Sequence, residues 1–181
     1  HFEDLIFPLF VFIAGVSLVF SLSKTLQHTD RRTATIRIFK RAALLYFIGI
    51  LYYGGFSTPF EKIRLLGVLQ RIALCYLFAG LMFCHLKPKA LIAACAGLLL
   101  GYWAMLSWIP VPGHGAGNFA EGANLANYVD QQFLPLRKHD GDHDPEGLLS
   151  TLPAIASCLL GVFAGLILQN PDLTDRKRVA R

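Results

Sequence analysis

Four charged side chains lie at the edges of long apolar segments or inside them, where an unpaired charge is costly. Asp4 directly precedes the uncharged run 5–23, Arg71 interrupts the run 65–86, and Asp144 and Glu146 precede the run 147–171. Ionisable groups at membrane depth usually face a bundle interior or a water-filled cavity, and they mark functional sites. An ion pair of Arg71 with Asp4 or Glu146 would lower this cost. The pattern leaves open whether such a pair does chemistry or only joins helices.

The apolar segments indicate an integral membrane protein. The 181-residue chain is 54% hydrophobic and only 16% charged, whereas soluble domains carry about 25% charged residues. Crossing about 30 Å of hydrocarbon takes roughly 20 apolar residues, and a helix satisfies its own backbone there. The sequence therefore predicts an all-α polytopic transmembrane helix bundle. We expect five spans, at about 5–23, 42–58, 65–86, 90–109 and 148–168, in a single membrane domain over residues 1–181.

The basic residues predict how the spans are oriented. Twelve of the 17 Lys and Arg residues lie after the first span, between the third and fourth spans, or after the fifth. The positive-inside rule places these segments in the cytoplasm, so the N-terminus and the loop 110–147 are expected outside. The four charged residues above then share the outer side. Because the basic residues form no single face, we expect the lipid bilayer, and no nucleic acid, as a partner.

One basic stretch, residues 31–43, could bind a negatively charged group on the cytoplasmic side. Its Arg37, Lys40 and Arg41 stand just before the second span. Such residues bind anionic lipid heads, and they could equally hold a phosphorylated cosubstrate. The alternative is that they only set the topology. The sequence alone does not separate these interpretations.

The run HDGDHD, residues 139–144, raises the question of a metal site. Asp140, Asp142 and Asp144 have the alternate spacing of a calcium loop. However, Pro145 stands where that loop needs its turn glycine, and Thr151 stands where it needs a bidentate glutamate. We therefore interpret the run as a solvated acidic loop and expect no metal.

Small residues inside the spans are interpreted as packing positions. Gly97 and Gly101 form one GxxxG pair, and Gly161 and Gly165 form another; such pairs permit close helix contact. The cysteines have no disulfide or zinc spacing. In the long loop, residues 124–133 could form a short surface helix.

Three stretches, in order, resemble one known family. EDLIFPLFVFIAGVS, RLLGVLQRIALCY and DPEGLLSTLPAIASCLLGVFAG are similar to the heparan-α-glucosaminide N-acetyltransferase family and its bacterial relatives, and GANLANYVDQQFLP is a weaker link. The resemblance implies transfer of an acetyl group from cytoplasmic acetyl-CoA to an amino sugar or glycan across a membrane, in bacteria the inner membrane. It also implies that the chain is the N-terminal portion of a larger membrane domain. A homo-oligomer is left open.

The resemblance assigns roles to individual residues. Asp4 matches the aspartate that opens the first span, Arg71 follows Gln70 in the family's QR pair, and Asp144 and Glu146 belong to its DPEG motif. Asp4 or Glu146 would orient the catalytic histidine or receive the sugar amine. Arg71 would fix these carboxylates or polarise the acetyl carbonyl. The family's histidine precedes the first residue here, so this chain alone is expected to be inactive.

Two other classes of function remain open at this point. In a transporter or permease half, Arg71 and the outer carboxylates would form a substrate or proton site. Discontinuous helices at mid-membrane would favour that interpretation. In a non-catalytic membrane scaffold, the outer loop would bind a partner, and the bundle would be unbroken and without a cavity.

Overall fold

Helices, and no strands, make up the regular secondary structure of the described part of the chain. A computed structural model describes residues 3–52, 63–139 and 141–170, with side chains from residue 5. Within these ranges the elements are α1 (Glu3–His28), α2 (Arg31–Tyr52), α3 (Val68–His85), α4 (Pro88–Trp108), α5 (Leu125–Phe133) and α6 (Thr151–Gln169). The all-α prediction is confirmed, and the short helix expected near 124–133 is present as α5.

Four of these helices are long and apolar enough to cross a membrane: α1 from Leu5, α3, α4 and α6. The remaining long helix, α2, carries five basic residues in its first half. Its apolar second half leads into residues 53–62, which lie outside the described part, so the end of the expected span 42–58 falls there too. A multi-pass helix bundle is therefore confirmed, and the individual span boundaries remain predictions.

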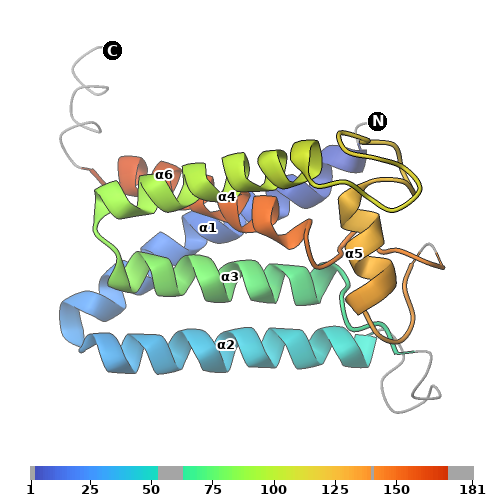
Figure 1. The fold of residues 1–181 in the computed structure, drawn as a ribbon. Coiled ribbons are helices and arrows are strands. Elements are labelled where there is room, and N and C mark those ends of the chain that lie inside the picture. Colours follow the sequence, from blue (N-terminus) through green and yellow to red (C-terminus); the bar gives the residue numbers. More distant parts are fainter. Residues whose placement is uncertain (1–2, 53–62, 140, 171–181) are drawn as a thin grey trace.

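The long helices lie side by side, and α6 is the central one. In Figure 1, α1, α3 and α6 all begin at the end of the bundle where α5 lies, and α2 and α4 run in the opposite direction. α6 contacts α1, α3 and α4, whereas α2 packs mainly on α3. This arrangement brings the beginnings of three parallel helices to one end of the bundle.

Glycines permit the close approach of α1 and α6. A Cβ atom at Gly15 would collide with the backbone oxygen of Cys158, and one at Gly161 would collide with that of Phe12. At Gly165 the neighbour is the Cβ atom of Val19, at 3.0 Å. The contact expected of Gly161 and Gly165 is thus present, with α1 as the partner.

The other glycine pair does not serve the same purpose. At Gly97 and Gly101 of α4, a Cβ atom would meet nothing within 4 Å among the described residues. The close contact expected of this pair is therefore wrong in the described structure. The two GxxxG patterns are alike in sequence, and only one of them faces a neighbouring helix.

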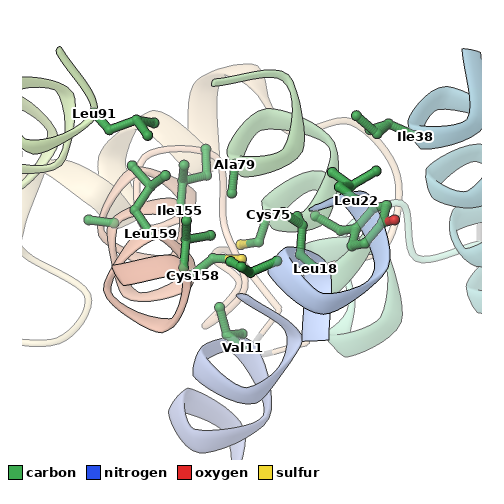
Figure 2. Packing of buried hydrophobic residues seen from close by; sticks show 14 of the residues in the cluster. Val11, Leu18, Leu22, Ile38, Cys75, Ala79, Leu91, Ile155, Cys158 and Leu159 are labelled. Atoms are coloured by element: carbon green, nitrogen blue, oxygen red, sulfur yellow. The ribbon is translucent and has the colours of Figure 1, made fainter. Parts of the chain in front are cut away.

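The core lies between α1, α3 and α6. Figure 2 shows Val11 and Leu18 of α1 meeting Cys75 of α3 and Cys158 of α6. All four cysteines are buried and free, as expected for small apolar packing residues. Large apolar side chains on the outer faces of α2 and α4 are exposed, including Phe47 and Leu100. Exposed apolar residues of this kind suit a surface whose solvent is lipid.

Candidate active site at one end of the bundle

The predicted catalytic residues lie at the end of the bundle where α3 and α6 begin. Segment 63–67 leads into α3, and the turn 144–147 lies shortly before α6. In Figure 1, α5 lies beside both. A small apolar cluster attaches α5 and the outer loop to the end of α4; it consists of Leu106, Val111, Leu125 and Ala126. This cluster holds α5 and the start of the loop against the end of α4.

Arg64 makes the principal ion pair of this site. Its Nε donates to Oδ2 of Asp144 at 2.8 Å, and its Nη2 donates to Oδ1 at 2.5 Å. The same Nη2 also donates to Oε2 of Glu146. Arg64 is 7% exposed and Asp144 only 2%. Such bidentate, charge-assisted contacts are strong and directional, so Arg64 fixes both carboxylates of the turn.

The two carboxylates differ in how tightly they are enclosed. Asp144 also accepts backbone N–H bonds from His139 at 3.1 Å and Glu146 at 3.0 Å. Burial alone would raise the pKa of Asp144, but the hydrogen bonds and charge of Arg64, with these backbone bonds, lower that pKa below 3.8. Asp144 is thus held in place in its charged form. The side chain of Glu146 bonds only Arg64 among the described residues, and part of it stays exposed.

Arg71 lies in the first turn of α3 and is 8% exposed. Its Nη2 donates to the carbonyl oxygen of Pro145 at 3.1 Å and to Oγ of Ser150. Its guanidinium carbon is 5.7 Å from the centre of the Phe7 ring, within the range of a cation–π contact. These partners are all neutral, so they hold the guanidinium in place without cancelling its charge.

The expected pairing of Arg71 with Glu146 is wrong in the described structure. Among the described residues, the carboxylates of Asp144 and Glu146 pair with Arg64 instead. The charge of Glu146 still acts on Arg71 through space. Asp4 lies in the first turn of α1 at this same end, but its side chain is outside the described part. The expected Asp4–Arg71 pair therefore stays a prediction.

Gln70, the neighbour of Arg71 in the QR pair, is fully buried. Its Nε2 donates to the carbonyl oxygen of Arg64 at 3.4 Å. Gly49 of α2 leaves space for this side chain, because a Cβ atom there would lie 2.7 Å from the Gln70 amide. Gln70 thus helps to position the backbone that carries Arg64.

Asp130 of α5 holds the turn from the other side. It is 1% exposed, and its two oxygens accept backbone N–H bonds from Leu148 at 2.8 Å and Asp144 at 3.4 Å. Burial raises the pKa of Asp130, although these N–H bonds oppose the effect. A Cβ atom at Gly147 would collide with the Asp130 carboxylate. A glycine is therefore required where the turn passes this side chain.

Gly147→Ala is expected to lower the stability of the protein by about 1–3 kcal/mol, as overpacking of a tight site does. The added methyl group would displace Asp130 and break its two bonds to the turn. The measurement is thermal unfolding of the purified full-length protein in detergent. Gly97→Ala is the matched control for steric contact, since a Cβ atom on this helical glycine meets nothing within 4 Å among the described residues. An unchanged melting temperature for Gly147→Ala would contradict this account of the turn.

The acidic run is only partly solvated. Asp142 is exposed and bonds Nδ1 of His143 at 2.6 Å, and that hydrogen bond lowers the pKa of Asp142. Asp144, in contrast, is buried, so the solvated interpretation is wrong for this residue because Arg64 supplies its counter-charge. Asp140 lies outside the described residues. Within the described residues no cluster of three His, Cys, Asp or Glu side chains could hold a metal ion.

The three basic residues expected to bind a cofactor lie in the other half of the bundle. Arg37 of α2 donates from Nη1 to Oγ1 of Thr25 at 3.0 Å. The guanidinium carbon of Arg41 is 5.2 Å from the centre of the Tyr76 ring. Lys40 is exposed beside them. In Figure 1 this half of α2 points away from α5, so these residues do not join Arg64 and Arg71.

Sequence reasoning missed Arg64 and Asp130. A signal for Arg64 was available, because it is a basic residue in a segment that the positive-inside rule places outside. A charge on the disfavoured side suggests a specific partner. Asp130 gave no comparable signal, since an aspartate on a short polar helix is ordinary.

The all-helical bundle and its buried charged turn are those of a multi-pass membrane protein. A family model described as "Heparan-alpha-glucosaminide N-acetyltransferase, catalytic" matches residues 1–180, and the chain belongs to this family. It is similar to heparan-alpha-glucosaminide N-acetyltransferase of Homo sapiens (31% identity) and of Mus musculus (30% identity), each over 91% of this chain. The chain spans about a third of these curated relatives, 32% and 33% of their length. Family membership does not favour the transporter alternative.

Proposed function

We propose that the whole protein transfers an acetyl group from cytoplasmic acetyl-CoA to a sugar on the extracytoplasmic side of a membrane, the bacterial inner membrane. The family match over residues 1–180 carries this proposal. The bundle supports it, because four helices are apolar and long enough to span a membrane. The buried charged turn at one end of the bundle is the proposed acceptor side. The N-terminus and the loop 110–147 would lie on that side.

The net reaction moves one acyl group. An acceptor nitrogen or oxygen attacks the thioester carbonyl carbon, a C–N or C–O bond forms, and the C–S bond breaks. The acceptor's proton passes through a base and ends on the thiol of CoA. Glu146 suits the base better than Asp144, because only Asp144 is enclosed by two backbone donors as well as Arg64. Arg71 would position the turn that carries Glu146, because its Nη2 bonds the carbonyl oxygen of Pro145.

The remaining parts of the proposal concern the donor. Arg37, Lys40 and Arg41 would bind the phosphates of acetyl-CoA near the cytoplasmic end. Arg37 and Arg41 are held in place by Thr25 and Tyr76, which reduces the entropy that a phosphate contact costs. The separation of these residues from Arg71 agrees with a donor and an acceptor that enter from opposite ends.

The test is a transfer assay with the full-length protein in sealed liposomes. Radiolabelled acetyl-CoA is supplied on one side and a panel of amino sugars on the other, and label is followed into sugar. Glu146→Gln is expected to lower kcat by about 10²–10⁴, the usual contribution of a general base. Glu121→Gln is the matched control, because Glu121 is an exposed loop carboxylate.

Either of two results would contradict the proposal. Wild-type turnover by Glu146→Gln would remove Glu146 from the reaction. Sugar uptake without acetylation, by a folded wild-type protein, would indicate a transporter. Transfer that requires donor and acceptor on opposite sides of the liposome would support both the activity and the orientation.

A further inference from the structure

Two adjoining cavities form one groove between α1 and α6, beside Arg71. The inner cavity, of about 240 Å³, is lined by Arg71 and Ser150 and by residues of α1 and α6. The outer cavity, of about 480 Å³, is lined by apolar residues of α1 and by Leu160 of α6. Both cavities are lined by Pro8 and Ser157, so they meet there. We call the two together the α1–α6 groove.

The outer part of the groove opens on the apolar surface of the bundle. Leu5 and Leu9 line it and are largely exposed, Leu9 at 56%. Both belong to a helix that is apolar enough to span a membrane. Among the described residues this part of the groove is open, and its apolar lining suits an apolar chain.

The inner part of the groove is mainly apolar, but it carries one positive charge and two hydroxyl groups. Among the described residues that line it, Arg71 supplies the charge, and Ser150 and Ser157 supply the hydroxyl groups. Nη2 of Arg71 has neutral partners, and Nη1 makes no hydrogen bond to the described residues. A guanidinium with a free edge favours an anionic oxygen, above all a phosphate.

We propose that the α1–α6 groove binds the acceptor as a sugar phosphate joined to an apolar chain. The chain lies between α1 and α6, the phosphate contacts Arg71, and the sugar next to it reaches Glu146. The last step follows because Arg71 bonds the carbonyl of Pro145, the residue before Glu146. This inference rests on the proposed function, and it names a lipid-borne acceptor in place of a soluble one.

The groove selects one kind of lipid over others. In a bilayer the chain is already surrounded by hydrocarbon, so burying it between helices gives no hydrophobic driving force. The groove instead sets where the chain leaves the site and at what depth the phosphate stops. Affinity for one lipid over another then depends on the phosphate contact with Arg71.

The experiment is photo-crosslinking on the full-length protein in liposomes. The probe is an alkyl phosphoglucosamine with a diazirine in its chain, and the comparison probe is the neutral alkyl glucosaminide with the same chain. We expect the phosphate probe to label peptides of α1 and α6 at least tenfold more than the neutral probe. Leu9→Trp, which fills the outer cavity at an exposed position, should abolish that labelling. Leu100→Trp is the matched control, because Leu100 of α4 is also exposed, at 63%, and lies outside the groove.

A kinetic measurement complements the labelling. Leu9→Trp should raise KM for the alkyl phosphoglucosamine about tenfold and leave transfer to free glucosamine unchanged. Labelling of α2 and α4 as strong as that of α1 and α6 would overturn the proposal, and so would labelling that Leu9→Trp does not change. If transfer to free glucosamine persists in either case, the proposed function still holds. Equal displacement of the probe by phosphatidylglycerol would overturn it too, since the groove would then hold bulk anionic lipid. Labelling without transfer to any acceptor would overturn the proposal together with the proposed function.

Discussion

Arg64→Met is expected to destabilise the protein by about 3–5 kcal/mol, the cost of removing one partner from a buried ion pair. The substitution would leave Asp144 and Glu146 without the guanidinium that bonds both. Thermal unfolding of the full-length protein in detergent is the measurement. Arg137→Met is the matched control, because Arg137 is exposed and surface substitutions usually change stability by less than about 0.5 kcal/mol.

The effect of Arg64→Met should depend on pH in a defined direction. The pKa of Asp144 is lowered in the folded protein, so the stabilisation by Arg64 is fully present above the ordinary value of 3.8. It is lost as pH falls through the lower, folded pKa. The gap in melting temperature between wild type and variant should therefore narrow in acid. A gap that is the same at pH 3 and pH 7 would show that charge is not its cause.

Gly161→Ala and Gly101→Ala are expected to change stability in opposite directions. At Gly161 the methyl group meets the backbone oxygen of Phe12, which cannot rotate away, so α1 and α6 must separate. Overpacking of this kind costs about 1–3 kcal/mol. At Gly101 the methyl group meets nothing within 4 Å among the described residues, and alanine stabilises a helix by about 1 kcal/mol over glycine.

Unfolding of the two variants, in parallel with wild type, separates packing from helix propensity. Gly161→Ala should also disturb the α1–α6 groove, since the same two helices form it. Equal stability of the two variants would mean that the close contact of α1 and α6 contributes nothing.

The helices were predictable because their cause is local. Apolar runs of about 20 residues leave the backbone no alternative in lipid, and α1, α3, α4 and α6 follow from them, although Arg71 interrupts the run that forms α3. The face that a helix presents is decided by its neighbours. For this reason, Gly97 and Gly161 carry the same pattern and have different surroundings. The path of α2 beyond Tyr52 lies outside the described residues.

Most residues of the site could be predicted from the sequence, but one ion pair was predicted wrongly. Asp144, Glu146 and Arg71 do gather at one end of the bundle, as their places before or early in apolar runs suggested. The partner of the carboxylates is Arg64, which lies 80 residues before Asp144. The choice between two arginines seven positions apart depends on the path of segment 63–67 and of the turn 144–147. Neither path can be predicted from the local sequence.

The 80-residue separation of Arg64 from Asp144 has a consequence for synthesis of the protein. At about 5–20 residues per second, the ribosome makes Arg64 and Arg71 roughly 4–16 seconds before the carboxylates of the turn. α3 is completed within this time, before Asp144 and Glu146, the partners of Arg64, exist. Arg64 can make its ion pairs only after the turn before α6 has been synthesised. Assembly of the bundle is therefore ordered in time. Its central helix, α6, is added after the turn that supplies the partners of Arg64.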